Sequence, residues 1–244
     1  MPHGFFTRHF YPALPAELTE AIAPHAQAYR VQQVHSADVL TPTEIERATQ
    51  EQADLPAADG VMSERPQQAV WTCSADCTPA LIADIETGQV AAVHAGWRGT
   101  AQKILPVAVA RLLARGSRIE NLRVALGPAI DGSVYQVGLD VAAEVGSTVV
   151  SVPTEAMSRE ARAPLLETLA HLLALEKSPL LSDPKPEHVR LDVRRINQMQ
   201  LEQMGLQPAQ IVIAPHCTYQ EPEHFFSYRR TREKKVQWSG IVSR

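Results

Sequence analysis

The chain has 244 residues, 45% of them hydrophobic and 20% charged, with three cysteines and a formal net charge of −4. This length suits one large domain, which buries enough apolar surface to fold without disulfide bonds. The interspersed charges argue against a nucleic-acid partner, no run of about 18 apolar residues predicts a membrane span, and the N-terminus lacks a signal-peptide pattern, so a cytoplasmic domain of enzyme size is expected.

Short apolar runs bounded by turn residues predict the strands of the core. They cover residues 68–73, 79–85, 89–95, 122–128 and 210–215. The second and third runs are separated by the short segment "ETG", which predicts a β-hairpin. In the third run, a period of two places Val90, Ala92 and His94 on one face and the intervening residues on the other.

Capping and stop signals predict the helices. Thr100 is expected to cap a helix over residues 101–114, which Gly116 ends and which Pro106 kinks or splits. Because strands and helices alternate irregularly, we expect one mixed α/β domain over residues 1–244. The other expected elements are a short helix followed by a loop in 44–60, a helix over 158–177, a proline-rich loop over 178–188, and a helix over 193–205 that ends at a glycine.

Three segments place a metal-capable side chain at the end of an apolar run. They hold His35 in "VQQVHSADV", Cys77 in "TCSADCTPALIAD" and His94 in "AVHAGWRGT". Residues at strand ends can converge on one edge of a sheet while their backbones stay fixed. A thiolate with two imidazoles is a typical zinc set with a fourth position for water, although ligand type alone leaves copper open. Cys73 is interpreted as a structural residue.

Arg98 lies between two glycines where the third segment leaves its strand. Gly96 and Gly99 can mark a tight strand-to-helix turn, but they also let backbone N–H groups approach an anion at a helix N-terminus. The planar guanidinium of Arg98 would add a bidentate donor for phosphate or carboxylate.

Seven motifs in order make the chain resemble the YfiH, or laccase-domain, family of purine nucleoside phosphorylases, formerly called polyphenol oxidases. The resemblance implies a mixed α/β (α+β) fold of layered helices and mixed sheets, related in its core to a toxin-type cysteine hydrolase fold. The motifs are "HGFFTR" (3–8), "QVHSADV" (33–39), "SADCTPALIAD" (74–84), "AAVHAGWRGT" (91–100), "LGPAI" with "YQVG" (126–138), "LDVRRINQMQL" (191–201) and "CTYQEPEHFFSYRR" (217–230).

The resemblance implies that His35, Cys77 and His94 hold zinc, with copper as the other possible metal. It also implies phosphorolysis of adenosine, inosine and methylthioadenosine, and deamination of adenosine to inosine. The partners would then be a purine nucleoside and phosphate, with the chain as a monomer or a small homo-oligomer. Asp76, beside the predicted thiolate ligand, is expected to carry protons or to orient its neighbours.

Phosphorolysis also requires an anion site below the sugar. The candidates for holding phosphate are Arg98 and one or both of Arg229 and Arg230, with Ser227 as a hydroxyl donor. The segment 9–31 is shorter than the corresponding family segment, and the tail 231–244 differs from the family tail. The contacts made by these two regions are therefore expected to differ from those in the family.

Three other functions fit parts of the same pattern. A copper-dependent polyphenol oxidase is the older family label, but multicopper electron transfer needs several copper sites and this chain has nine histidines and no HxH pair. A cysteine hydrolase would use Cys77 as nucleophile and His94 as base. A metal-binding or regulatory protein without turnover is the fourth reading.

Overall fold

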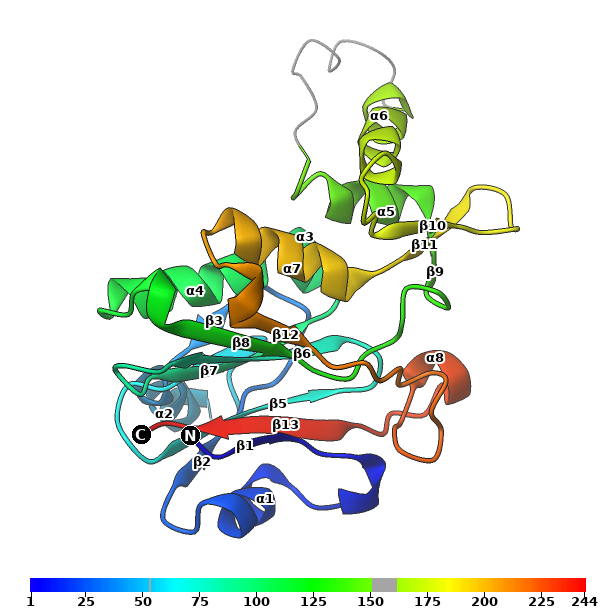
Figure 1. Ribbon diagram of the computed structural model, residues 1–244. Helices are drawn as coiled ribbons and strands as arrows, with labels where there is room; N and C mark the ends of the chain where they lie inside the picture. The colour runs from blue at the N-terminus through cyan, green and yellow to red at the C-terminus, as the bar shows by residue number, and fades with distance from the viewer. Residues whose placement is uncertain (53, 151–161) are drawn as a thin grey trace.

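Two β-sheets packed face to face form the core of the computed structural model, which describes residues 1–52, 54–150 and 162–244 (Figure 1). Both sheets contain parallel and antiparallel pairs. The six-stranded sheet has the order β12 (Ile211–Ile213), β8 (Leu122–Leu126), β6 (Thr78–Asp84), β7 (Val90–Ala95), β4 (Gly60–Met62) and β3 (Val39–Leu40). The four-stranded sheet has the order β1 (His3–Phe5), β13 (Gln237–Val242), β5 (Gln68–Ser74) and β2 (Gln27–Tyr29).

Strand β7 shows how alternation assigns side chains to the two faces of the larger sheet. Val90 and Ala92 are fully buried between the sheets, in one cluster with Val70 of β5. Ala91 and Val93 belong to the cluster on the opposite face, against the helices. The predicted alternation is therefore confirmed, and it places the side chain of the next even-numbered residue, His94, on the inter-sheet face.

Helices cover the outer faces of both sheets, which produces a layered arrangement (Figure 1). Apolar residues of α4 and α7 pack on the six-stranded sheet, and α1 packs on the four-stranded sheet. The helices in chain order are α1 (Pro15–Ile22), α2 (Pro42–Gln52), α3 (Trp97–Ala101), α4 (Ile104–Ala114), α5 (Leu139–Gly146), α6 (Arg162–Leu173), α7 (Val193–Gln203) and α8 (Tyr228–Thr231).

A third, three-stranded sheet lies beside this core with α5 and α6 (Figure 1). Its strands are β10 (Leu180–Ser182), β11 (His188–Leu191) and β9 (Gln136–Gly138). These elements share a separate hydrophobic cluster with part of α7, and Trp97 of α3 packs against that cluster. The small sheet and its helices therefore support one side of the segment that follows β7.

The predicted hairpin is confirmed, because β6 and β7 pair antiparallel with Pro79 opposite His94. All five predicted strands form, with ends that differ by up to two residues from the expected ones. The mixed α/β fold class is also confirmed, by the sheets described above and by the structural relatives described below. None of the helices in the described ranges is long and apolar enough to cross a membrane.

The helix expected over residues 101–114 is wrong at its start. Residues 97–101 already form α3, so Thr100 lies inside a helix and does not cap one. Lys103 then adopts a left-handed backbone conformation with φ of 60°, which separates α3 from α4. Pro106 lies in the first turn of α4, where its missing N–H removes no helical hydrogen bond. Gly116 ends the helix with φ of 97°, as predicted.

The proline-rich segment 178–188 is a second correction, because it was expected to be a loop. It contains β10 and the first residue of β11, which pair as an antiparallel hairpin. The prolines lie outside the paired positions, so no ladder hydrogen bond is lost. Of the helix expected over 158–177, α6 covers 162–173, and residues 158–161 lie outside the described ranges.

Candidate metal centre

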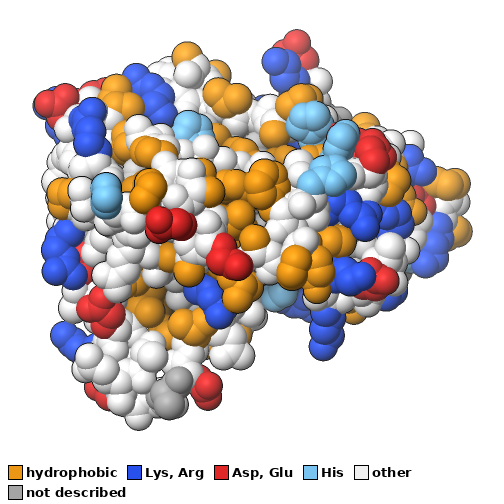
Figure 2. Space-filling view, turned by 90° about the horizontal axis from the view of Figure 1, so that it is seen from below, with side chains coloured by type: hydrophobic (Ala, Val, Ile, Leu, Met, Phe, Trp, Pro, Cys, Tyr) orange, Lys and Arg blue, Asp and Glu red, His pale blue; other side chains and the backbone are white. Residues whose placement is uncertain are grey.

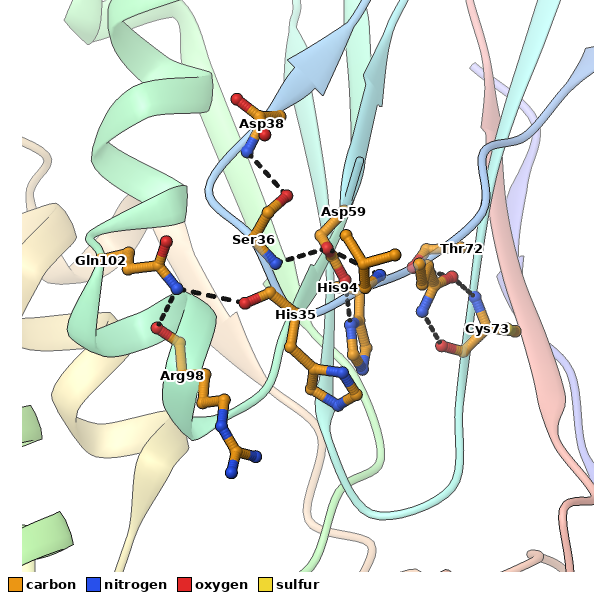
Figure 3. Close-up of polar contacts among 11 residues, drawn as sticks. His35, Ser36, Asp38, Asp59, Thr72, Cys73, His94, Arg98 and Gln102 are labelled. Atoms are coloured by element: carbon orange, nitrogen blue, oxygen red, sulfur yellow. Dashed lines mark hydrogen bonds and ion pairs between the residues drawn. The ribbon is translucent and has the colours of Figure 1, made fainter. Parts of the chain in front are cut away.

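The structure brings the three predicted ligands together. His35 lies in the segment that joins β2 to β3, Cys77 lies in the turn before β6, and His94 lies near the end of β7. Their ligand atoms all lie within 4.8 Å of one another, and the two imidazole ring centroids are 4.9 Å apart. Figure 3 shows the rings of His35 and His94 side by side. This donor set of two nitrogens and one sulfur suits zinc or copper.

A buried carboxylate, Asp59, holds two of these ligands in position (Figure 3). One of its oxygens lies 2.8 Å from Nδ1 of His94, and Asp59 is fully buried. The other oxygen accepts hydrogen bonds from the backbone N–H groups of Val34 and Ser36, at 3.1 and 2.6 Å. These two residues flank His35, whose φ of 65° is left-handed. Since Asp59 occupies Nδ1 of His94, Nε2 remains for a metal ion.

Gly96 leaves the space in which the ligands meet. A Cβ atom at this position would lie 2.8 Å from Sγ of Cys77 and 3.3 Å from Cδ2 of His35. Any side chain would therefore displace the sulfur of Cys77 and crowd the ring of His35. The space left by Gly96, the donor set and the orientation that Asp59 gives His94 together fit a bound metal ion.

Charge in the metal-free site is concentrated on a thiolate–imidazolium pair. Burial raises the pKa of the Cys77 thiol, but charge and hydrogen bonds from His94 and His35 outweigh burial and lower it to about 6. Burial opposes protonation of His94, yet Cys77 and Asp59 raise its pKa to about 9. The thiol is thus deprotonated near neutral pH, which is the state in which cysteine binds metal.

In metal-free protein, iodoacetamide is expected to alkylate Cys77 before Cys73. Cys77 is a thiolate above a pH of about 6, whereas burial raises the pKa of Cys73 to about 12. The alkylation rate, followed by mass spectrometry, should fall as the pH drops through about 6, and added zinc should block it. Cys77→Ser is the control. A rate that keeps rising up to a pH of about 9, as for an ordinary thiol, would contradict this charge state.

The ligands lie at one part of a cavity of about 750 Å³, within the range of about 300–1,000 Å³ typical of small-molecule sites. Its walls include the aromatic rings of Trp97, Tyr135 and Tyr228. Arg98 is exposed, its guanidinium lies 4.3 Å from the centroid of the Trp97 ring, and it extends toward the same side as the two imidazoles (Figure 3). The cavity can therefore hold an aromatic, anionic ligand beside the metal ligands.

Asp76 connects this cavity to two distant segments. Its carboxylate accepts hydrogen bonds from the Thr218 hydroxyl at 2.7 Å and from the Arg229 backbone N–H at 2.7 Å. Its backbone has φ of 104°, and its carbonyl accepts from the N–H of Ile130. Because both carboxylate oxygens are engaged, the geometry favours an orienting role over proton transfer.

The predicted phosphate-binding residues separate into two groups. Arg98 and Arg229 line the cavity, and the Arg229 guanidinium lies 4.9 Å from the centroid of the Tyr135 ring. Arg230 turns away and donates to three backbone carbonyls, those of residues 218, 219 and 225. Ser227 is 1% exposed and caps α8 through the Arg230 backbone N–H. The last two side chains are committed to the local fold and do not line the cavity.

Sequence reasoning missed Asp59, Tyr135 and the cavity-lining residues 232–236. A carboxylate directly before the apolar residues of β4 was the available signal for Asp59. Tyr135 lies inside the quoted motif "YQVG", yet no pattern in the sequence indicates that its ring faces the cavity. For the tail, the sequence indicates only a departure from the family pattern.

This chain is similar to known proteins in both sequence and structure. Residues 15–242 match the family model described as "Multi-copper polyphenol oxidoreductase laccase". "Purine nucleoside phosphorylase slr1573" of Synechocystis sp. is 51% identical over 243 residues, which cover 99% of this chain and 89% of that protein. "Adenosine deaminase RL5", from an unknown prokaryotic organism, is 28% identical and aligns with 81% of this chain and 68% of its own length. The solved structure of YlmD from Geobacillus stearothermophilus has a TM-score of 0.74 at 26% identity, covering 93% of this chain and 77% of that one.

Proposed function

The chain belongs to the multi-copper polyphenol oxidoreductase laccase family, and we propose that it is a zinc-dependent purine nucleoside phosphorylase that also deaminates adenosine. The names of its relatives indicate an enzyme that acts on purine nucleosides. The observation that carries the proposal is the grouping of three potential metal ligands, His35, Cys77 and His94, beside a cavity that arginine side chains also line.

In this proposal the metal site serves deamination, and the arginines that line the cavity serve phosphorolysis. His35, Cys77 and His94 would hold the zinc ion, which would supply Lewis acidity for activating water toward an electrophilic carbon such as C6 of a purine. Arg98 and Arg229 hold phosphate, so that one phosphate oxygen can bond to C1′ as the bond from C1′ to the purine nitrogen breaks. The base leaves with a proton. In deamination, water adds its oxygen at C6 and the exocyclic nitrogen leaves as ammonia.

A cysteine hydrolase is the second candidate, because Cys77, His94 and Asp59 form a nucleophile, a base and a group that orients the base. His35 has no place in that scheme, whereas it supplies the third donor of a metal site. Phenol oxidation by several coppers fits less well, since the described residues contain one group of three or more potential ligands.

The test is to supply adenosine with and without phosphate and to follow adenine, inosine and hypoxanthine by chromatography. The proposal predicts adenine only when phosphate is present, and inosine in both cases. Protein that contains stoichiometric metal and forms neither product would overturn the nucleoside assignment.

Arg98→Ala is expected to reduce phosphorolysis by about 10²–10³-fold, the range that removal of one positioned charge-stabilising donor produces. Deamination should fall by less than about tenfold, because it needs no bound phosphate. Both kcat/KM values should be measured on the same preparation. Arg118→Ala, which removes an exposed arginine paired with Glu120, is the control. Equal losses in the two reactions would make Arg98 a structural residue.

A further inference from the structure

The cavity beside the metal ligands carries more positive charge than one bound phosphate requires. The chain as a whole has a formal net charge of −4. Lys and Arg side chains nevertheless gather on the side of the molecule that carries α8 in the view from below (Figure 2). The cations that line the cavity are Arg98, Arg229, Arg232, Lys234 and Lys235, and the carboxylates that line it are Asp76 and Glu233.

The two carboxylates leave most of these cations unbalanced. Both oxygens of Asp76 are engaged by Thr218 and by a backbone N–H. Glu233 pairs with Lys235 at 3.2 Å; the Glu233 side chain is exposed and that of Lys235 is partly exposed. No salt bridge within the described part of the chain therefore offsets the charge of Arg232 or of Lys234.

Arg232 and Lys234 line the cavity in addition to the proposed phosphate-holding pair, and we call these two residues the outer cations. They follow α8 in the segment before β13, whereas Arg98 belongs to α3 and Arg229 to α8 itself. The guanidinium of Arg232 lies 5.5 Å from the centroid of the Tyr228 ring, which holds it without neutralising it. Lys234 is exposed, and its side chain makes no hydrogen bond or ion pair among the described residues.

Like charges gathered around one cavity repel one another unless an anion offsets them. Inorganic phosphate on Arg98 and Arg229 leaves the outer cations without a counterpart. A cavity of about 750 Å³ leaves room for a second anionic group beside a nucleoside. The arrangement therefore suits a substrate that brings a phosphate of its own.

On the basis of the proposed function, we propose that the outer cations bind the 5′-phosphate of a nucleoside 5′-monophosphate while inorganic phosphate is bound by Arg98 and Arg229. In phosphorolysis of adenosine 5′-monophosphate, a phosphate oxygen bonds to C1′ and the bond from C1′ to the base nitrogen breaks. Adenine leaves with a proton, and the sugar product carries phosphate at both C1′ and C5′. No oxidant or reductant is needed.

The experiment compares adenosine with adenosine 5′-monophosphate, in kinetics and in calorimetric titration with and without saturating phosphate. The ratio of kcat/KM for the nucleotide to kcat/KM for the nucleoside should fall about tenfold in R232A/K234A, the change expected for losing one or two charge-assisted hydrogen bonds. In the wild-type protein, the KM for the nucleotide should also rise more steeply with ionic strength than the KM for adenosine does. Lys185→Ala, which removes one exposed cation outside the cavity, should leave the ratio unchanged.

Three outcomes would overturn the inference. The wild-type protein could bind the nucleotide no more tightly than adenosine, saturating phosphate could abolish nucleotide binding, or the double variant could keep the wild-type ratio. If a single-stranded oligonucleotide binds more tightly than the monophosphate through the same two residues, the outer cations belong to a nucleic-acid site and the inference is likewise wrong. Failure of the proposed function is distinct, because in that case adenosine itself is not converted while titration still reports on the outer cations.

Discussion

His94→Ala is expected to remove the metal ion and to reduce deamination, in which the metal activates water, by at least about 100-fold, the upper end of what losing an outer partner of a metal ligand costs. His94 supplies one of three donors and is 4% exposed, so water cannot readily take its place. Elemental analysis of purified protein and kcat/KM for each reaction are the measurements. Retention of stoichiometric metal would remove His94 from the ligand set.

Two further variants separate this effect from damage to the fold. His94→Ala leaves the buried Asp59 without its partner, a change that costs about 3–5 kcal/mol of stability when a buried pair is broken. Cys77→Ser removes a different ligand with almost no change in shape, and it should lose the metal while its thermal unfolding stays close to that of metal-free wild type. His216→Ala is the matched control, because His216 also pairs with a carboxylate, Glu221 at 2.8 Å, on an exposed surface.

Asp59→Asn is expected to weaken metal binding by about 10–100-fold while the fold is retained, as for other residues that orient metal ligands. An amide can accept from His94 or from the N–H groups of Val34 and Ser36, but its NH₂ end opposes whichever donors it faces. The same change therefore disturbs two ligands. A competition titration with a chromophoric chelator gives the affinity.

Asp84→Asn is the matched control for burial of a carboxylate. Asp84 is fully buried, as Asp59 is, and accepts from the backbone N–H groups of Glu86 and Thr87 in the turn after β6. That turn lies at the opposite end of β6 from Cys77. Its variant should bind metal with wild-type affinity; equal weakening in both variants would mean that Asp59 acts only on the stability of the fold.

The sequence was most informative where chemistry and local pattern coincide. His35, Cys77 and His94 are unusual residue types at the ends of apolar runs, and the predicted alternation along β7 is confirmed for residues 90–93. The sequence was least informative where pairing between strands that are distant in the chain determines the structure. β1 has three residues and forms only because β13, more than 230 residues later, lies beside it.

Two parts of the site show why the sequence could not supply the rest. Arg229 and Arg230 are adjacent in one motif, yet successive residues of a helix point about 100° apart, so Arg229 lines the cavity and Arg230 does not. Asp59 is an ordinary acidic residue before a three-residue strand. Its importance follows from the antiparallel pairing of β4 with β7, which places it beside His94.

X-ray absorption at the zinc edge of the purified protein tests the central claim most directly, because it reports the atoms bound to the metal. Two imidazole nitrogens and one sulfur from residues 35, 77 and 94 predict one sulfur at about 2.3 Å and nitrogens at about 2.0–2.1 Å. The sulfur shell should disappear in Cys77→Ser. A wild-type spectrum with only nitrogen and oxygen neighbours, or a sulfur shell that survives this substitution, would contradict the account.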